Sequence, residues 1–331
     1  MKAVVIEQLG SAVVKDLPVP EAGPGEVLVQ VHASGICGTD IHIYRGEYLG
    51  GYPVITGHEF SGVVKDVGAG VGRITPGDRV AIEPNIACDN CSACLNNRQN
   101  FCENWRGVGV SMPGGMAEYV SVPEKAVYSI GDIPFQEGAF VEPLACVLHG
   151  VERTRFKMGD RVLIIGAGPI GILLSMTIQL QGSCCVTQVD KNQARLDLAR
   201  SSGAYVTCSS LDEVEPESFD IVVDATGVPK LMEQTITYVR KGGTVLLFGV
   251  PPQHQSISLP AFTIFEKGLI ILSSYTSVRN SVQAVRLLES RAVDVGSLVS
   301  HVLPLKEFTQ GIEIIEQSRE GVLKVLIDPQ Q

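Results

Sequence analysis

Four cysteines fall close together in the spacing Cys88-x2-Cys91-x2-Cys94-x7-Cys102. Thiolates are soft ligands, and four of them in one short segment suit a single tetrahedral Zn²⁺ with no position left for a substrate. We therefore interpret the segment 88–102 as a structural zinc lobe. Reduced free cysteines and an iron–sulfur cluster are the alternatives, because thiolates also hold clusters.

A second set of metal-type side chains is spread along the chain, at Cys37, His58-Glu59 and Glu142. Cysteine, histidine and carboxylate can together build a mononuclear zinc site with one open position, which is the catalytic arrangement. Spacing alone does not bring these residues together. Taken singly, His58 is more often a core or surface histidine, and Glu142 a solvated acid.

A glycine-rich segment, Gly166-Ala-Gly-Pro-Ile-Gly171, follows the apolar run 162–165, which we predict to be a buried parallel strand. The first glycine allows a tight turn, the second lets the backbone approach a pyrophosphate, and the third lets a helix pack on the strand. The helix that begins there presents free N–H groups to an anion. The segment predicts a dinucleotide site; a glycine-rich turn without a ligand is the alternative.

The acid that ends the next apolar run bears on the choice of dinucleotide. Asp190 follows the run 184–189, and a carboxylate there accepts hydrogen bonds from a ribose diol and repels a 2′-phosphate. Lys191 and Arg195 could soften that repulsion. The sequence favours NAD over NADP.

Composition bounds the remaining possibilities. The chain has 331 residues, enough for two domains, and a net charge of −10, which argues against a nucleic-acid surface. No apolar run reaches the roughly 18 residues that a membrane span needs. The start, 1–7, reads as a strand without a signal peptide. Nine cysteines in such a chain indicate metal binding or catalysis in a reducing compartment, so we expect a cytoplasmic protein.

The predicted secondary structure that positions these residues differs between the ends and the middle of the chain. Short apolar runs split by Gly, Pro and Asp turns predict a β-rich domain at 1–151, which a strand-rich tail at 279–331 rejoins. Between them, 152–278 alternates strand and helix and predicts a doubly wound parallel sheet. We expect strands near 161–166, 184–189, 219–224, 243–250 and 268–274, and helices near 169–181, 192–201, 228–240 and 279–291.

These motifs together resemble the zinc-dependent medium-chain alcohol dehydrogenases, and above all their polyol branch, which includes sorbitol and xylitol dehydrogenases. The resemblance covers essentially the whole chain. It is carried by G-I-C-G-T-D-I-H, G-H-E-F-S-G, the four-cysteine lobe, G-G-M-A-E-Y, V-E-P-L-A-C-V-L-H and G-A-G-P-I-G, in that order. It implies an α/β plus β fold, in which a GroES-like β-barrel catalytic domain is joined to a Rossmann NAD-binding domain with the active site in the cleft between them.

The resemblance also implies roles for single residues. Thr39 matches the hydroxyl that takes the substrate proton, His42 the histidine that passes it to solvent, and Asp40 the carboxylate that orients the ligating histidine. Glu59 and Glu142 adjust the charge at the catalytic metal; ethanol-type enzymes carry cysteine where this chain has Glu142. The implied zinc ligands are Cys37, His58, Glu59 and Glu142 for the catalytic ion, and Cys88, Cys91, Cys94 and Cys102 for the structural one.

The implied cofactor contacts lie in the Rossmann domain. They are Gly166, Gly168, Pro169, Ile170, Gly171, Asp190, Arg195, Thr226, Phe248, Gly249, Val250 and Ser274. The implied reaction moves a hydride from a secondary hydroxyl of a polyol to NAD and gives a ketose, in a homodimer or homotetramer with no membrane partner.

One departure concerns the substrate. Sorbitol dehydrogenases often carry Arg-Tyr after the sixth Rossmann strand, where this chain has Ser274-Tyr275, which puts sorbitol itself in doubt. A sugar-alcohol phosphate, a sugar acid or a 3-hydroxy amino acid such as threonine remain as alternatives. A non-catalytic NAD-binding protein of the same fold is a remote one.

Overall fold

The computed structural model describes residues 1–47, 51–317 and 321–331. They form two units, the first from 1–145 with 277–331 and the second from 146–276. Helix α4 (Val141–Arg153) begins in the first unit and continues into the second. Within the described ranges, no helix is both long enough and apolar enough to cross a membrane.

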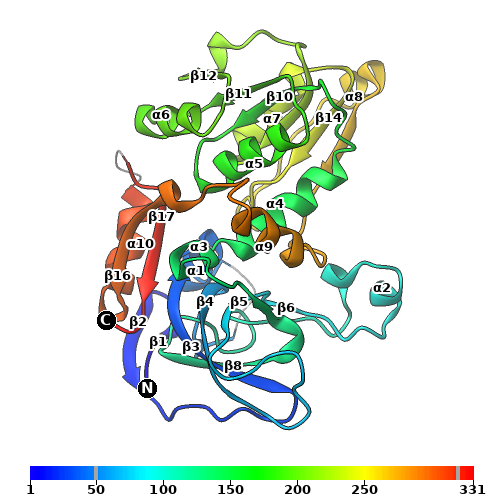
Figure 1. The fold of residues 1–331 in the computed structure, drawn as a ribbon. Coiled ribbons are helices and arrows are strands. Elements are labelled where there is room, and N and C mark those ends of the chain that lie inside the picture. The colour runs from blue at the N-terminus through cyan, green and yellow to red at the C-terminus, as the bar shows by residue number, and fades with distance from the viewer. Residues whose placement is uncertain (48–50, 318–320) are drawn as a thin grey trace. The chain divides into compact units, whose positions relative to one another are not determined.

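The first unit is built on a seven-stranded sheet in the order β16–β17–β3–β4–β5–β9, with β8 also paired to β3 (Figure 1). The pairing is antiparallel except between β16 and β17. Its strands are β3 (Glu26–Gly35), β4 (Glu59–Val67), β5 (Arg79–Ile82), β8 (Tyr119–Pro123), β9 (Val127–Ser129), β16 (Val299–Pro304) and β17 (Lys324–Asp328).

Alternating valines explain why β3 lies at the centre of this sheet. Val27, Val29 and Val31 are fully buried and pack in one cluster with Phe60 and Val80 from the neighbouring strands. Side chains at every second position of a strand face the same side, so this pattern commits one face of β3 to the core. The end of the same strand, at Gly35, thereby reaches the segment that carries Cys37.

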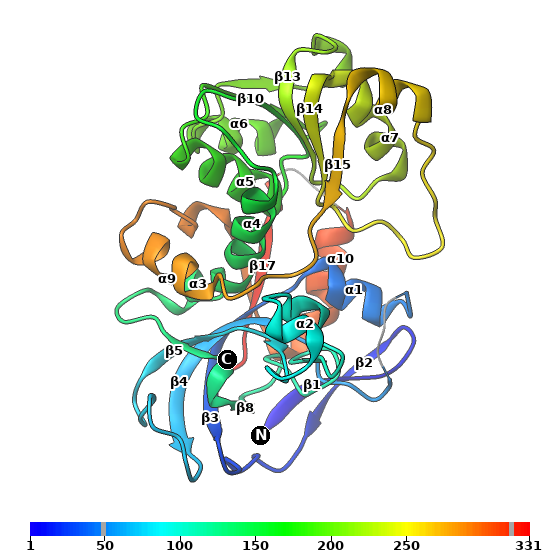
Figure 2. The ribbon, with the colours of Figure 1, turned by 90° about the vertical axis from the view of Figure 1, so that its right-hand side faces the viewer.

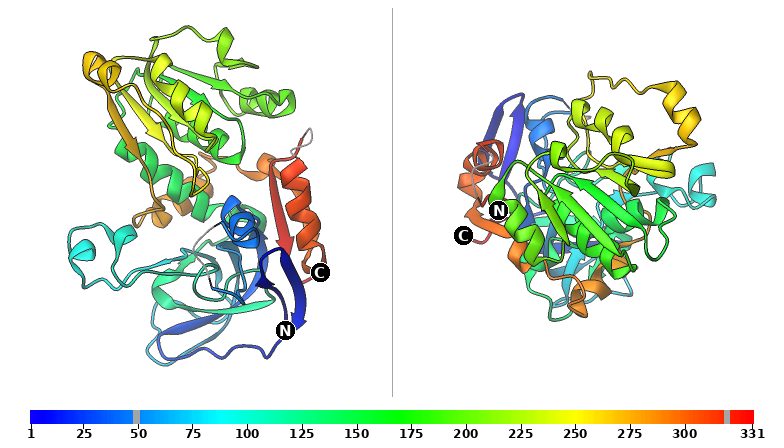
Figure 3. Two further views of the ribbon diagram at one scale, coloured as in Figure 1. Left: turned by 180° about the vertical axis from the view of Figure 1, so that it is seen from behind. Right: turned by 90° about the horizontal axis from the view of Figure 1, so that it is seen from above.

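Smaller elements complete the first unit. Two short antiparallel pairs are β1 (Lys2–Gln8) with β2 (Ser11–Asp16), and β6 (Asn85–Ile86) with β7 (Arg106–Gly107). The remaining helices are α1 (Gly38–Tyr44), α2 (Ser92–Leu95), α3 (Phe135–Gly138), α9 (Ser281–Glu289) and α10 (Phe308–Gln317). Helix α10 lies against β17, as the orange and red elements show (Figure 3). The cyan segment around α2 projects from the rest of this unit (Figures 1 and 3).

The second unit is a six-stranded, wholly parallel sheet in the order β12–β11–β10–β13–β14–β15. The strand order reverses between β10 and β13, so the crossover helices cover both faces of the sheet (Figures 1 and 2). The strands are β10 (Arg161–Ile165), β11 (Cys185–Val189), β12 (Val206–Cys208), β13 (Phe219–Asp224), β14 (Val239–Leu247) and β15 (Ile270–Ser273). The helices are α5 (Pro169–Leu180), α6 (Gln193–Ser201), α7 (Pro229–Tyr238) and α8 (Ala261–Lys267). The predicted fold class, a doubly wound sheet joined to a β-rich domain, is confirmed.

Strand β12 and helix α8 of this unit were among the elements that were not predicted. Strand β12 has only three residues at the edge of the sheet, and its Val206 is 45% exposed, so it carries no alternating pattern. Helix α8 turns Phe262 and Phe265 outward, at 74% and 81% exposure. An outward aromatic face disguises the apolar stripe by which surface helices are recognised.

Candidate functional site

The loop that carries Cys37 is shaped by a reciprocal helix cap. Cys37 precedes α1 with an extended backbone and accepts the Asp40 N–H at its carbonyl. The Asp40 carboxylate in turn accepts the Cys37 N–H at 2.8 Å and the Gly57 N–H at 3.0 Å. One fully buried acid therefore joins the Cys37 loop to the segment that precedes His58.

Three of the predicted ligands come together in the first unit. The ligand atoms of Cys37, His58 and Glu59 all lie within 4.8 Å of one another. His58 and Glu59 are buried, and Cys37 is half-buried. Gly57, just before them, has φ +91°, and a Cβ there would lie 2.7 Å from the Met116 N, so the close turn into β4 requires glycine.

The charge around His58 is suited to a cation. Burial on its own lowers the pKa of His58, but the negative charges of Asp40, Cys37 and Glu142 outweigh it and raise that pKa well above its usual value. The Nδ1 edge of the ring faces Asp40 at 3.9 Å, too far for a hydrogen bond. Burial raises the pKa of Asp40, and His58 opposes that rise.

Glu142 is placed differently from the other three. It is buried in the first turn of α4 and contributes to the charge at His58. Among the described residues, its carboxylate is not part of the 4.8 Å group. The structure therefore gives a set of three residues, with Glu142 as a neighbouring negative charge.

Sequence reasoning missed Lys324, which lies on β17 and forms a buried ion pair with Glu59. Burial lowers the pKa of Lys324, but Glu59, Cys37 and Asp40 outweigh this and raise it. A Cβ at Gly35 would lie 2.4 Å from the Glu59 Oε2 and 2.8 Å from the Lys324 Cε, so glycine leaves room for the pair. The available signal was a single lysine inside the apolar run 322–327.

Lys324→Met should lower the unfolding free energy of the metal-free first unit by about 3 kcal/mol, because it leaves the buried Glu59 carboxylate without its cation. The single tryptophan, Trp105, lies in this unit and reports its unfolding in urea by fluorescence. Adding Glu59→Gln to Lys324→Met should restore part of the loss. Equal stability of wild type and Lys324→Met would show that the pair contributes nothing.

The predicted proton-transfer residues lie on α1. The Thr39 Oγ1 is 4.0 Å from the Cys37 Sγ, which puts the hydroxyl beside the group of ligands. His42 follows one turn later, and its Nδ1 is 2.8 Å from the Glu47 Oε2. Glu47 was also missed, although a carboxylate that holds one ring nitrogen leaves the other to exchange a proton.

The donor set fits a metal ion. A thiol, an imidazole and a carboxylate are the ligand types of catalytic zinc, and here they converge in a buried, negatively charged place. Within the described ranges, the Glu59 Oε2 has only its ion pair with Lys324. A cation bound by the Glu59 carboxylate would add a second partner at this buried acid.

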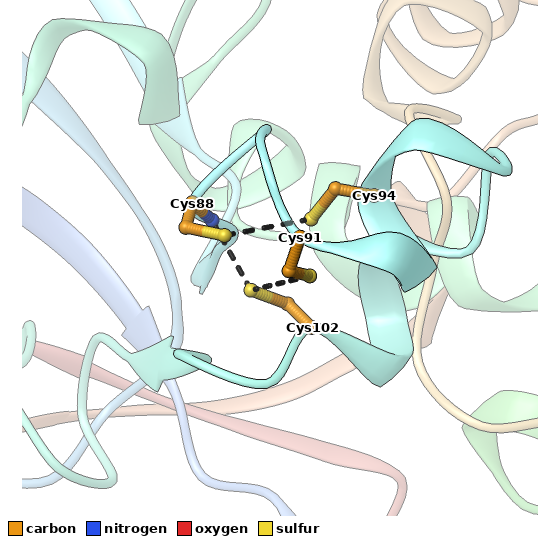
Figure 4. A group of neighbouring side chains, drawn as sticks. All are labelled: Cys88, Cys91, Cys94 and Cys102. Atoms are coloured by element: carbon orange, nitrogen blue, oxygen red, sulfur yellow. Dashed lines mark hydrogen bonds between the residues drawn. The ribbon is translucent and has the colours of Figure 1, made fainter.

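The four-cysteine lobe forms a second metal-type group, with all four sulfurs within 4.8 Å of one another (Figure 4). The Sγ atoms of Cys88 and Cys94 are 4.0 Å apart, and those of Cys91 and Cys102 are 3.9 Å apart. Zn–S bonds of about 2.3 Å in a tetrahedron require sulfurs about 3.8 Å apart. Backbone N–H donors, first that of Asn90, lower the pKa of Cys88 to about 6, which favours the thiolate.

In the second unit, the glycine segment has the geometry of a phosphate loop. Gly166 turns at φ +109°, and a Cβ at Gly171 would lie 2.1 Å from the Gly166 O, so the start of α5 packs directly on the turn. Pro169 opens α5 at a position where its missing N–H costs nothing. Gly168 has open space at its Cβ position, as a close backbone approach by a ligand needs.

Asp190 lies at the end of β11 beside this loop. Its Oδ2 accepts the Ala167 N–H at 2.7 Å, and its Oδ1 accepts the Asn192 N–H at 2.9 Å. Arg195, in the first turn of α6, donates its backbone N–H to the Asn192 side chain. The acid is thus held in place by the backbone on both sides, with lone pairs remaining on each oxygen.

The other predicted cofactor contacts follow strands β13 to β15. Thr226 and Gly227 donate to the buried Asp224 carboxylate, whose pKa burial raises. A Cβ at Gly249 would lie 2.0 Å from the Gly227 N, so the loops after β13 and β14 touch. Val250 is 64% exposed, and Phe248 and Ser274 both pack against Gly150.

Asp190→Ala should lower the ratio of kcat/KM for NAD over that for NADP by about tenfold or more, because it removes a ribose acceptor and a charge that repels a 2′-phosphate. Steady-state kinetics with both cofactors measures the ratio. Asp197→Ala is the matched control, because Asp197 is an acid on α6 that bonds Gln193. A wild-type enzyme with the higher kcat/KM for NADP would refute this interpretation of Asp190.

Comparisons with known proteins agree with this geometry. Residues 23–132 match the family described as the alcohol dehydrogenase GroES-like domain, and residues 135–327 match the glucose dehydrogenase C-terminus. The chain is 38% identical to D-altritol 5-dehydrogenase of Agrobacterium fabrum (strain C58 / ATCC 33970) over 93% of this chain and 94% of that protein. It is 32% identical to L-threonine 3-dehydrogenase of Bacillus velezensis (strain DSM 23117 / BGSC 10A6 / LMG 26770 / FZB42), with 99% of each covered.

Solved structures agree as well. A Sinorhizobium meliloti 1021 protein assigned as a zinc-binding dehydrogenase, in a crystal structure bound to NADP, has a TM-score of 0.94 and 35% identity, with 99% of each chain covered.

Proposed function

The chain belongs to the zinc-dependent medium-chain alcohol and polyol dehydrogenase family, and from this premise we propose that it oxidises a secondary hydroxyl of a polyol to a ketose with NAD as hydride acceptor. The observation that carries the proposal is the convergence of Cys37, His58 and Glu59 within 4.8 Å. Packing alone does not require these three side chains as a set. The similarity to D-altritol 5-dehydrogenase supports a polyol as the substrate.

Residues of the first unit would hold the catalytic zinc and transfer the proton of the substrate hydroxyl. Zinc bound there would polarise the substrate hydroxyl, and NAD would accept the hydride. Cys37, His58 and Glu59 would ligate the ion, and Glu142 would bind it directly or through water. Thr39 would accept the substrate proton at its Oγ1, and His42 would pass it towards solvent at the ring nitrogen that Glu47 leaves open.

We assign the second metal group a structural role. Cys88, Cys91, Cys94 and Cys102 would fill all four positions of a tetrahedral zinc, which leaves none for a substrate. The segment around them is polar and would not stay ordered by burial alone, because its apolar cluster, apart from the cysteines, contains only Ala87 and Trp105 among the described residues. The zinc therefore supplies the stability of the lobe.

A 3-hydroxy amino acid is the second candidate substrate, because L-threonine 3-dehydrogenase matches the chain over its whole length. Sugar-alcohol phosphates and sugar acids also remain, since Ser274 stands where sorbitol enzymes often place an arginine. A non-catalytic protein of this fold would bind NADH without turnover. Competition assays separate the candidates: an added polyol should slow threonine oxidation if polyols are the true substrates, while threonine should leave polyol oxidation unchanged.

We further propose a homodimer formed through the edge of the parallel sheet. β15 is one of the two edge strands of the six-stranded sheet, paired among the described strands with β14 alone, and Ile270 on it is 47% exposed. The exposed rings of Phe262 and Phe265 on α8 lie 6.3 Å apart. An edge strand offers free N–H and C=O groups to another strand, and exposed aromatic residues are typical of interfaces. A second copy of this chain would cover both.

Phe265→Glu should convert this dimer to a monomer, because it places a charge in the apolar contact. Size-exclusion chromatography with light scattering measures the mass of the particle. Leu180→Glu, at a residue of α5 that is 52% exposed, is the matched control. An unchanged particle mass for Phe265→Glu would overturn the proposed interface. None of the nine cysteines, all of which lie in the described ranges, forms a disulfide, which supports a reducing compartment such as the cytoplasm.

A further inference from the structure

Gln188 is a polar residue that is buried in the apolar interior of the second unit. It lies on β11, an interior strand of the parallel sheet, opposite Ile164 of β10, and is 0% exposed. Its neighbour on the same face, Val186, is equally buried. Interior strands of parallel sheets are ordinarily continuous apolar runs, so packing alone does not explain an amide here.

The Gln188 amide is directed at the glycine loop. Its Nε2 donates to the Gly166 carbonyl at 3.0 Å, and a Cβ on Gly171 would lie 3.1 Å from the same nitrogen. Its Oε1 is buried without a partner among the described residues. Leaving a buried acceptor unsatisfied costs folding free energy, which an apolar side chain of the same size would avoid.

The bond from Gln188 holds one end of a peptide unit whose other end is held by Asp190. The Gly166 carbonyl and the Ala167 N–H belong to the same planar peptide, and the Ala167 N–H donates to the Asp190 Oδ2 at 2.7 Å. The Gly166 N–H is fixed separately by the Val189 carbonyl at 2.7 Å. Gln188 on β11 and Asp190 just after it thus hold the two polar ends of one peptide.

We propose that Gln188 is a positioning residue for the dinucleotide, which acts through the Gly166–Ala167 peptide of the glycine loop on the Asp190 carboxylate. The inference rests on the proposed function, because it needs a dinucleotide at this loop. Gln188 itself would not contact the cofactor.

The hydrogen bonds at the two ends of this peptide are needed because glycine does not fix its own backbone conformation. Gly166 is at φ +109°, and without a side chain many other conformations are open to it. If the 166–167 peptide turned over, its carbonyl would face the Asp190 carboxylate, and like partial charges would meet. The Gln188 amide favours the observed orientation from the carbonyl end, so that the Ala167 N–H keeps Asp190 in place for a ribose diol.

Gln188→Met tests this, because methionine has a similar volume and no hydrogen-bond donor. The dissociation constant for NADH, measured by fluorescence titration without any substrate, should rise by at least about fivefold, the effect of one lost hydrogen bond. The midpoint of thermal unfolding should stay close to that of the wild type, since the orphaned Oε1 is removed together with the bond. Thr177→Val is the matched control, because Thr177 on α5 is also buried with an unpartnered hydroxyl, and its NADH affinity should be unchanged.

A double-mutant cycle with Asp190→Ala separates positioning from general packing. If Gln188 acts through the peptide on Asp190, Gln188→Met should change the NADH affinity less than about twofold in the Asp190→Ala background. A full effect in that background would overturn the proposal, and so would a Gln188→Met protein with wild-type affinity. Gln188→Leu replaces the methionine variant if the latter does not fold. A wild-type chain that binds no NADH would overturn the proposed function and this inference with it, whereas the other outcomes bear on Gln188 alone.

Discussion

Replacing Thr39 with alanine should lower kcat for alcohol oxidation by about 10²-fold or more, because oxidation requires a proton to leave a closed site. The Thr39 hydroxyl lies 4.0 Å from the Cys37 Sγ, beside the predicted metal ligands. His42 is one turn further along α1 and half-buried, with Glu47 on its ring. His42→Gln should have a smaller effect than Thr39→Ala, since water can replace a group near solvent more readily than one beside the metal.

Two controls separate proton transfer from packing. Thr39→Ser keeps the hydroxyl and should retain most of the activity. NADH affinity and the midpoint of thermal unfolding should be close to wild type in all three variants. If Thr39→Ala unfolds the protein while turnover per folded molecule stays intact, Thr39 only caps or packs the Cys37 loop, and the proton route is refuted.

Mild chelation should abolish activity before it disturbs the fold, with a loss of about 10²-fold or more as the polarising ion leaves. The two metal groups differ in a way that predicts this order. The predicted catalytic ligands include a carboxylate and leave an open position, whereas the lobe offers four thiolates in a closed shell. Freshly prepared protein should contain two zinc ions per chain, and the first to be removed should be the one on which activity depends.

Matched cysteine variants assign each ion to its site. Cys37→Ser should lower activity and the zinc content by one ion, with little change in thermal stability. Cys94→Ser should lower the thermal midpoint, because the lobe loses the zinc that orders it. At most one zinc per chain in chelator-free wild-type protein would contradict the two-site assignment, as would full activity after both ions are removed.

The parts of the fold that sequence predicted are those with a local signal. A continuous apolar run indicated β10, and the glycine segment indicated the turn into α5, because each depends on neighbours in the chain. Strand β12 and helix α8 gave no such signal: one is too short, and the other faces its aromatic residues outward. The start of β14 was also missed, since the predicted helix extended to residue 240 and the predicted strand began only at residue 243.

The same distinction holds for the site. The four-cysteine lobe could be identified from spacing because its ligands lie within one loop. The group Cys37, His58 and Glu59 could be assembled only by resemblance, since strands β3 and β4 bring it together through their antiparallel pairing at Gly35 and Glu59. The role of Lys324 could not be predicted from the sequence, because its partner Glu59 is more than two hundred residues away along the chain. The pairing of β17 with β3 places Lys324 beside Glu59.

The measurement that tests the central claim most directly is an NAD reduction assay across four- to six-carbon polyols, their phosphates, sugar acids and threonine, with the zinc content of the protein verified. We predict NADH formation with at least one polyol and an equal amount of ketose, at a kcat/KM above that for threonine, and loss of the signal in Thr39→Ala. NADH binding without turnover of any of these compounds, by protein that holds both zinc ions, would contradict the account.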